Sequence, residues 1–374
     1  MLVAMGYRRE IFMTKATKEL VEISLLDSAR INEKEEGQAL YTTEDVLKLF
    51  KLFRVKDFSE SFTVGEFEVF FHRAGHILGA ASVGLRDKSG GKGVVFSGDV
   101  GTGKSPLIRP FVAPSEAEVV VMESTYGSRL HEKNEELRIL KEQVDYVYRT
   151  GGTLMIPVFS IQRSQRVLYR LHQLYEKEGL PGGMKVYFDS PMAIAVTRVF
   201  KRQVKEYSDE LMNESIGKDP FSFPGLIVTE EAWKSRKKIG KDEGSKVIVA
   251  GSGMMSGGRM MRHATEYLGD VKSRLLIVGY QAEGTLGREL IEGAKVVEID
   301  GREIKVEVEI ERIKSMSAHG DQKQLLTWLS GIRGVKKVIL THGEDESRAV
   351  LSEKIKERLG VEVLKPMLGE EIEV

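Results

Sequence analysis

Short apolar strands alternate with helices through the middle of this chain, and that alternation limits the folds open to it. Apolar strands separated by helices of this length form a parallel sheet with right-handed crossovers. The middle block is therefore predicted to be a Rossmann-like domain, although it lacks the glycine fingerprint of dinucleotide-binding proteins. The predicted strands cover 153–157, 185–189, 246–250 and 274–279, and the predicted helices cover 134–149, 163–178, 192–207 and 259–268.

The segments on either side of this block predict a second α/β domain. Strands are expected at 80–86, 93–97 and 119–122 before the block, and helices and strands alternate again from 322 to 364 after it. The simplest architecture is an outer domain built from both ends of the chain, with the middle block inserted. A chain of 374 residues is long enough for two domains, and it buries enough surface to need no disulfide or structural metal.

Composition excludes several classes of protein. The chain has no cysteine, which rules out disulfide frameworks, zinc fingers, iron–sulfur clusters and thiol nucleophiles. Its 56 basic residues balance its 56 acidic ones, so any basic groove for nucleic acid must be local. No apolar run reaches the roughly 18 residues of a membrane span, and the first six residues are too short for a signal peptide. We expect no membrane association and a cytoplasmic protein.

Five short blocks each place a histidine or an acid beside glycine or at the end of an apolar run. Such positions lie at the rim of an α/β sheet, where these proteins build their sites. Imidazole and carboxylate ligands without sulfur suit zinc or manganese in a hydrolytic site. The blocks are Ala74–Gly79 with His76, Phe96–Gly101 with Asp99, Glu123–Gly127, Ser317–Asp321 with His319, and Thr341–Glu344 with His342.

The remaining histidines have no glycine-rich or acidic context. We predict structural roles for His72, His131, His172 and His263. His172 falls in the middle of a predicted helix and His72 within a predicted strand.

Two loops lead from a predicted strand into a helix in the middle block. The glycine-rich run Ala250–Arg259 could use its backbone N–H groups as an anion nest, with Ser252 and Gly253 in the loop and Arg259 as a clamp on phosphate. The alternative is a flexible turn with a helix cap. In the run Phe159–Gln165, Ser160 and Arg163 are placed where a helix N-terminus and a side chain both favour phosphate.

The segment Gly98–Ser105 matches the P-loop pattern of nucleotide-binding proteins. A P-loop must open directly into a helix, and here Pro106 and Pro110 interrupt the required turns. We therefore favour Asp99 as a metal ligand at a strand end, followed by a loop. A P-loop NTPase stays as the weaker alternative, and it predicts ATP binding through Lys104.

Taken together, the blocks resemble the β-CASP branch of the metallo-β-lactamase superfamily, which includes ribonuclease J and the endonuclease subunit of the polyadenylation cleavage complex. The resemblance covers essentially the whole chain. It implies an α/β fold in which a metallo-β-lactamase domain of the αββα type, N-terminally incomplete, carries an inserted Rossmann-like β-CASP domain. The implied boundaries are 1–127 and 306–374 for the first domain and 128–305 for the second.

The resemblance also implies a function, which is two-metal hydrolysis of RNA phosphodiester bonds with zinc, in RNA processing or decay. Single-stranded RNA would be the partner, and a homodimer is compatible with the family. Glu123 and His319 would be the catalytic acid–base pair. The implied metal ligands are His76, Asp99 and His342, and the implied RNA phosphate contacts are Ser160, Arg163, Ser252, Gly253 and Arg259.

One motif of that family is absent from the chain, the compact run His-x-His-x-Asp-His that supplies further metal ligands. Two hypotheses follow from this absence. In the first, the chain is a metal-dependent ribonuclease, and we expect the working protein to begin upstream of Met1 and to supply the run. In the second, the chain is a non-catalytic RNA-binding or scaffold homologue that binds RNA without cleaving it.

Overall fold

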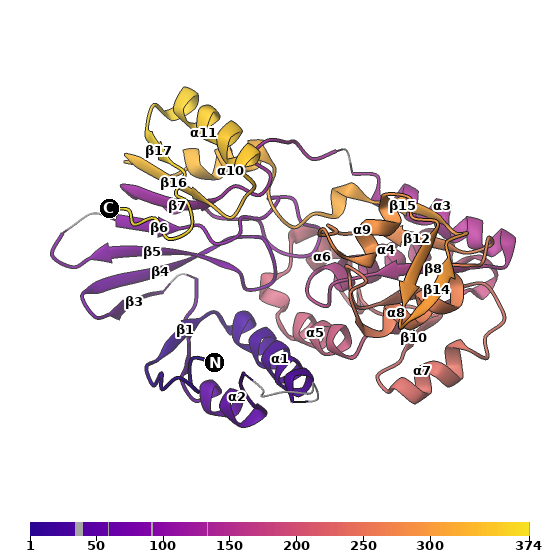
Figure 1. The fold of residues 1–374 in the computed structure, drawn as a ribbon. Coiled ribbons are helices and arrows are strands. Elements are labelled where there is room, and N and C mark those ends of the chain that lie inside the picture. Colours follow the sequence, from indigo (N-terminus) through magenta and orange to yellow (C-terminus); the bar gives the residue numbers. More distant parts are fainter. Residues whose placement is uncertain (34–39, 59, 91–92, 133, 374) are drawn as a thin grey trace. The chain divides into compact units, whose positions relative to one another are not determined.

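The computed structural model describes residues 1–33, 40–58, 60–90, 93–132 and 134–373. The chain forms two compact units (Figure 1). The first comprises Met1–His131, Gln203–Glu210 and Ala318–Val374, and the second comprises Glu132–Arg202 and Leu211–Ser317. The boundaries expected from the sequence were 127/128 and 305/306. The return of Gln203–Glu210 to the first unit had no counterpart in the sequence pattern.

The second unit contains the parallel sheet that the helix–strand alternation predicts. Its six strands lie in the order β10-β9-β11-β8-β12-β15, and every pairing is parallel. The short edge strands β10 and β15 were not predicted as members of this sheet. The strands are β8 (Thr153–Pro157), β9 (Lys185–Asp189), β10 (Leu226–Val228), β11 (Lys246–Ala250), β12 (Arg274–Ile277) and β15 (Glu309–Arg312).

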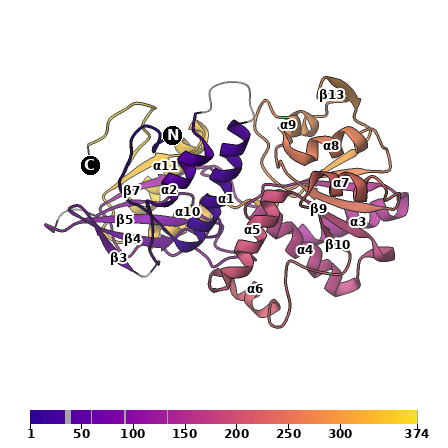
Figure 2. The same ribbon diagram turned by 90° about the horizontal axis from the view of Figure 1, so that it is seen from below.

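Helices cover both faces of this sheet because its central strands are apolar on both sides. Met260 and Ala264 of α8 pack with Ile248 of β11 on one face, and α3 contacts β8, β11 and β12 from the other (Figure 2). A separate antiparallel hairpin joins β13 (Val296–Ile299) and β14 (Arg302–Lys305). The helices are α3 (Glu136–Thr150), α4 (Arg163–Glu178), α5 (Pro191–Arg202), α6 (Asp209–Glu214), α7 (Ala232–Ile239), α8 (Gly258–Tyr267) and α9 (Leu286–Ile291).

The first unit is built on a mixed seven-stranded sheet in the order β17-β16-β7-β6-β5-β4-β3. Strands β3 to β6 are antiparallel, whereas β6, β7, β16 and β17 are parallel. The α/β fold expected from the sequence is confirmed in both units. The strands are β3 (Ser61–Val64), β4 (Phe67–Arg73), β5 (Ala81–Asp87), β6 (Gly93–Phe96), β7 (Val119–Glu123), β16 (Lys337–Thr341) and β17 (Glu362–Leu364).

One face of this sheet is covered by α10 (Gln322–Ser330) and α11 (Asp345–Leu359). Trp328 of α10 and Leu351 of α11 join Val120 and Leu340 of the sheet in one buried cluster. Towards the start of the chain, β1 (Ile11–Met13) pairs in parallel with β2 (Phe53–Val55), beside α1 (Lys15–Asn32) and α2 (Thr43–Phe50). None of the helices in the described ranges combines the length and apolarity that crossing a membrane requires.

A buried ion cluster joins α3 to α4 in the second unit. The Glu136 side chain is fully buried and accepts hydrogen bonds from Arg166 and from the Nε atom of Arg170, the latter at 2.8 Å. Burial raises the pKa of Glu136, but the charges of the two arginines outweigh it and bring that pKa below its usual value. Arg166 also donates to the backbone carbonyls of Ser315 and Ser317, both at 3.4 Å. The cluster therefore holds the segment that leads into residue 318.

We predict that Glu136→Gln lowers the free energy of unfolding by about 3–5 kcal/mol, because two buried guanidinium groups lose their counter-ion. The folded-state pKa of Glu136 is depressed, so its stabilisation is present above the unfolded-state value of about 4.3 and is lost as the pH falls through the folded-state pKa. Denaturant unfolding at pH 7 and in acid measures both effects. The matched control is Glu142→Gln, an exposed glutamate on the same helix that pairs with Arg138, and it should leave stability almost unchanged. Equal stability of the two variants would contradict the prediction.

Candidate functional site

The parallel part of the first unit's sheet brings three of the predicted site residues to one edge. Strands β6, β7 and β16 are paired in parallel register, with Val94 and Lys337 both opposite Val119 and with Thr341 opposite Glu123. Their carboxyl ends therefore lie together, as the sequence analysis assumed. Asp99 follows β6, Glu123 is the last residue of β7, and His342 follows β16.

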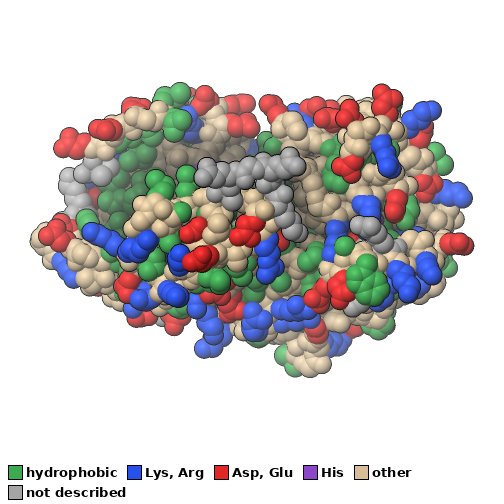
Figure 3. Space-filling view, turned by 60° about the horizontal axis from the view of Figure 1, so that its bottom comes forward, with side chains coloured by type: hydrophobic (Ala, Val, Ile, Leu, Met, Phe, Trp, Pro, Cys, Tyr) green, Lys and Arg blue, Asp and Glu red, His purple; other side chains and the backbone are tan. Residues whose placement is uncertain are grey.

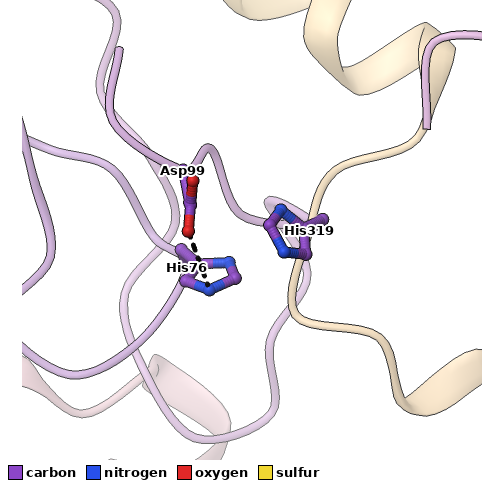
Figure 4. A group of neighbouring side chains, drawn as sticks. All are labelled: His76, Asp99 and His319. Atoms are coloured by element: carbon purple, nitrogen blue, oxygen red, sulfur yellow. Dashed lines mark ion pairs between the residues drawn. The ribbon is translucent and has the colours of Figure 1, made fainter. Parts of the chain in front are cut away.

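Two loops add His76 and His319 to this edge. His76 lies in the connection from β4 to β5, and His319 lies in the loop that precedes α10. Figure 4 shows Asp99 and His76 directed at one another, with the His319 ring beside them. The structure thus brings together His76, Asp99, Glu123, His319 and His342, which come from five separate segments of the chain.

Glycines let the loops pack this closely. A Cβ on Gly101 would lie 1.7 Å from the carbonyl oxygen of Gly75, so no other residue fits there without moving the backbone. The Gly101 N–H donates to the carbonyl of Ala74 at 2.7 Å, and Gly101 forms a β-bridge with His319. Glycine at position 101 therefore fixes the loops of His76, Asp99 and His319 against one another.

His342 is held in an unusual backbone conformation. Its φ of 47° lies in the left-handed region, which residues with a Cβ rarely adopt. Its carbonyl oxygen accepts from the Ser124 N–H at 3.2 Å and from the Thr125 hydroxyl at 3.1 Å. These bonds from the segment after β7 hold the imidazole at the sheet edge.

Asp99 is the central carboxylate of the group. One oxygen, Oδ1, lies 3.0 Å from Nδ1 of His342, and the other, Oδ2, lies 3.7 Å from Nε2 of His76. The His76 and His319 ring centroids are 4.3 Å apart. Two sets, His76 with Asp99 and His319, and Glu123 with His319 and His342, each offer ligand atoms within 4.8 Å of one another. This spacing and the nitrogen–oxygen donor set fit a zinc-type ion.

The protonation state of His76 also suits a metal ligand. Burial, and to a lesser extent the positive charge of His319, lower the pKa of His76 to about 4, although Asp99, Glu123 and the Ala318 backbone act in the opposite direction. The ring is therefore neutral near pH 7, with a lone pair available. Within the described residues, its buried Nδ1 atom has no hydrogen-bond partner, as fits a ring nitrogen that binds a metal.

Glu123, at the end of β7, contacts His319. Its carboxylate is 1% exposed and lies 3.1 and 3.2 Å from Nδ1 of His319. The N–H groups of Val100 and Thr125 donate to it at 2.6 and 3.3 Å. Burial raises the pKa of Glu123, but these hydrogen bonds and the His319 charge bring it below its usual value. An ionised carboxylate only accepts hydrogen bonds, so Nδ1 of His319 carries the proton.

His131, for which the sequence predicts a structural role, lies next to His319. Its Nε2 atom lies 2.8 Å from the carbonyl oxygen of His319, and the backbone N–H of His131 donates to the Asp321 carboxylate at 3.0 Å. The Tyr126 ring stands edge-on to both imidazoles, with centroids 5.4 Å from His131 and 5.9 Å from His319. The available signal was weak, since His131 follows the Glu123 block by only a few residues but has no glycine-rich setting of its own.

Asp321 ends the predicted block Ser317–Asp321, and its side chain caps α10. It accepts from the Gln324 N–H at 2.9 Å, while the Asp321 N–H donates to the side-chain oxygen of Gln324 at 2.8 Å. The other carboxylate oxygen accepts from His131. This cap therefore fixes the backbone two residues after His319.

The predicted phosphate loops lie together in the second unit. Gly253 packs against Phe159, because a Cβ on Gly253 would lie 2.7 Å from the Phe159 ring and 2.8 Å from its backbone nitrogen. Ser252 accepts from the Ser256 N–H at 3.0 Å, which folds the glycine-rich loop onto itself. Arg163 is the first residue of α4 and Ser160 lies just before it. The loops after β8 and β11 thus meet.

Arg259 makes contacts that the sequence did not suggest. Its guanidinium donates to Asp189 at 2.5 Å, to the Thr229 carbonyl at 2.7 Å and to the Glu230 carbonyl. Burial raises the pKa of Asp189, but bonds from His263, Ser235, Arg259 and Thr229 outweigh it and lower that pKa. The arrangement favours a structural role in which Arg259 neutralises buried Asp189. His263, predicted to be structural, belongs to the same network at 2.8 Å from Asp189.

The P-loop alternative is wrong. After β6 the chain runs without a helix from residue 97 to residue 118, so no helix N-terminus follows Ser105. Lys104 lies in that irregular segment. The N–H groups of Leu107 and Ile108 donate to the Ser105 hydroxyl oxygen there. The phosphate cradle of a P-loop needs the missing helix.

Comparison with known proteins agrees with the site geometry. Residues 164–290 match the Beta-Casp domain family, and residues 303–366 match the family described as the Zn-dependent metallo-hydrolase RNA specificity domain. A ribonuclease of Thermus thermophilus is 33% identical over 99% of this chain and 83% of its own length. An RNase J-like protein of Methanocaldococcus jannaschii is 30% identical over 96% of this chain and 82% of its own.

A more distant relative is a transcription termination factor, FttA, of Methanocaldococcus jannaschii. It is 28% identical over 97% of this chain, which spans 58% of the factor's length. The two domain matches and the relatives that align along almost the whole chain agree with one another. The chain belongs to the β-CASP family of the metallo-β-lactamase superfamily, a family of RNA nucleases.

Proposed function

We propose that this chain hydrolyses phosphodiester bonds of single-stranded RNA with zinc held at the edge of the first unit's sheet. One observation carries the proposal. Asp99 lies between His76 and His342, with the Glu123–His319 pair beside them, so metal ligands and an acid–base pair occupy one place. The names of the relatives, which include a ribonuclease and an RNase J-like protein, support RNA as the substrate.

His76, Asp99 and His342 would hold the metal. When bound, zinc lowers the pKa of a coordinated water to about 7 and so supplies a nucleophile at neutral pH. The chain prepares its own side of this site, since burial keeps the His76 imidazole neutral and the backbone bonds of Ser124 and Thr125 fix His342. The family match that names a zinc-dependent metallo-hydrolase domain supports this choice of ion.

His319 would act as the general acid. Its Nδ1–H is fixed on Glu123, which leaves Nε2 as the atom that hands a proton to the leaving oxygen of the ribose. The buried carboxylate stabilises the imidazolium form from which that proton comes, and it prevents the ring from turning away. His131 and Tyr126 would be positioning residues, because they touch the His319 backbone and ring rather than the substrate.

In the second unit we propose that Ser160, Arg163, Ser252 and Gly253 contact RNA phosphates. The loops that carry them meet at the carboxyl ends of β8 and β11, where a parallel sheet places its ligands. Arg259 would support these loops through Asp189. A homodimer, implied by the family resemblance, and the cytoplasmic location expected from the sequence complete the proposal.

We predict that Asp99→Asn lowers zinc affinity by at least about tenfold, because the substitution removes the charged central ligand. Metal analysis after equilibrium dialysis measures the bound zinc. The matched control is Asp57→Asn, an exposed aspartate of the same unit away from the site, which should keep the affinity of the natural chain. Equal zinc binding by the two variants would show that Asp99 is not a ligand.

His319 lies close enough to Asp99 and Glu123 to serve either as an acid or as a metal ligand, and one variant separates the two roles. We predict that His319→Asn retains the zinc content of the natural chain and lowers RNA cleavage by about 10²–10⁴-fold. Glu123→Gln should lower cleavage as well, whereas Glu66→Gln, an exposed glutamate between β3 and β4, should not. Loss of zinc together with loss of cleavage would make His319 a ligand instead. RNA binding with neither zinc nor cleavage in the natural chain would favour the scaffold alternative.

For His131 we predict that Phe and Gln substitutions behave differently. His131→Phe keeps a ring against Tyr126 but removes the polar atom that meets the His319 carbonyl, whereas His131→Gln can place an N–H near that oxygen. The Phe variant should lose about tenfold or more in kcat with KM and zinc content unchanged, and the Gln variant should recover most of it. Steady-state cleavage kinetics test this, and equal kcat values for both variants would reject a positioning role.

A further inference from the structure

Helix α7 carries a large aromatic side chain on the protein surface. Trp233 is 60% exposed, whereas the other tryptophan of the chain, Trp328, is fully buried in the first unit. The helix is anchored by its other side, where Ser235 and Ile239 are buried. Trp233 and Lys237, one helical turn apart, are both exposed and lie on the same outward side. The aromatic ring is thus displayed to solvent and does not contribute to a core.

The same segment is strongly basic. From Ala232 to Lys241 it contains five basic residues and no acid, in a chain whose net charge is zero. Lys237, Lys238 and Lys241 are exposed, and within the described residues none of these three forms an ion pair. Figure 3 shows Lys and Arg side chains, with some Asp and Glu side chains among them, next to exposed hydrophobic side chains on the part of the surface where α7 lies.

Four acids flank the segment, Glu230 and Glu231 before it and Asp242 and Glu243 after it, and contacts of Glu230 and Asp242 tie these two to other parts of the unit. Glu230, before the helix, pairs with Arg198 at 2.5 Å. Asp242, after it, accepts from the Tyr187 hydroxyl at 2.6 Å and pairs with Lys185 at 3.3 Å. Glu231 and Glu243 are exposed and reduce the net charge of the segment, so what it offers an anionic partner is the ammonium groups of the three exposed lysines.

We propose that the exposed surface of α7 and of the turn that follows it, which we call the α7 surface and which consists of Trp233, Lys237, Lys238 and Lys241, is a second binding surface for single-stranded RNA. An exposed indole beside lysines is the chemistry by which proteins hold unpaired strands: the ring stacks on a base and the ammonium groups contact phosphates. The surface would hold a stretch of the same RNA or of another strand without reading its sequence. This inference rests on the proposed function for RNA as the partner, and it adds a contact that is separate from the metal site.

Intrinsic fluorescence tests the proposal directly, because Trp233 is the exposed tryptophan and Trp328 is buried. The full chain, with EDTA present to stop cleavage, is titrated with an unstructured oligouridylate. We expect the emission to be quenched on binding, and we expect no such change in Trp233→Phe. Trp233→Ala should weaken binding by about 5- to 150-fold, the effect of losing one base stack. Tyr148→Ala, which removes another exposed aromatic ring of the second unit, should leave affinity unchanged.

Salt dependence tests the lysines. Changing Lys237, Lys238 and Lys241 together to Gln should reduce the slope of log affinity against log salt by about 2, because three phosphate contacts to a single strand are lost. The matched control changes Lys272, Lys295 and Lys305 to Gln, three exposed lysines of the same unit, and should keep the slope. Equal slopes for the two triple variants, or an unquenched natural chain, would overturn the proposal.

Two further outcomes separate this proposal from its alternatives. Quenching by vesicles of phosphatidylserine, with none by the oligouridylate, would mean that the surface binds membranes and would also overturn it. A chain that is quenched by RNA but does not cleave it with zinc present would contradict the proposed function and leave the α7 surface standing. Cleavage of RNA with zinc, without quenching of the tryptophan emission by RNA, would support the proposed function and overturn the proposal for the α7 surface.

Discussion

The parallel pairing of β6, β7 and β16 is the constraint on which the site depends. Because the three strands share one direction and one register, Asp99, Glu123 and His342 reach the same edge of the sheet from positions far apart in the sequence. A slip of one residue in β7 would turn Glu123 to the other face of the sheet and separate it from His319. The buried cluster around Trp328 holds this register by packing α10 and α11 over the strands. Core packing and chemistry are therefore linked through the sheet edge.

The site itself is arranged in two layers. Asp99 and His342 form the exposed outer layer, and the buried Glu123 carboxylate forms the inner layer. An ionised carboxylate that is 1% exposed needs donors, and it finds them in His319 and in two backbone N–H groups. His131 then fixes the His319 backbone from behind. Because Nδ1 of the His319 ring is fixed on Glu123, the ring can transfer a proton to RNA only through Nε2.

Much of the fold and of the candidate site could be predicted from the sequence, and the features that could not be predicted lack a local sequence signature. Strand ends after apolar runs identified Asp99 and His342, because local pattern and parallel topology determine where such residues lie. His131 was missed because its partner is the backbone carbonyl of a residue 188 positions away, which leaves no local signature. Arg259 is predicted to clamp phosphate, and its contact with Asp189, 70 positions earlier, likewise has no local signature. The edge strand β10 escaped prediction because three residues are too few for a periodic pattern.

The central claim is that the edge of the first unit's sheet holds catalytic zinc. Anomalous diffraction at the zinc absorption edge, from crystals of this chain grown with zinc, tests it most directly. The account predicts an anomalous peak about 2.0–2.2 Å from a carboxylate oxygen of Asp99 and from nitrogens of His76 or His342. A peak elsewhere on the molecule, or none at this edge at saturating zinc, would contradict the account.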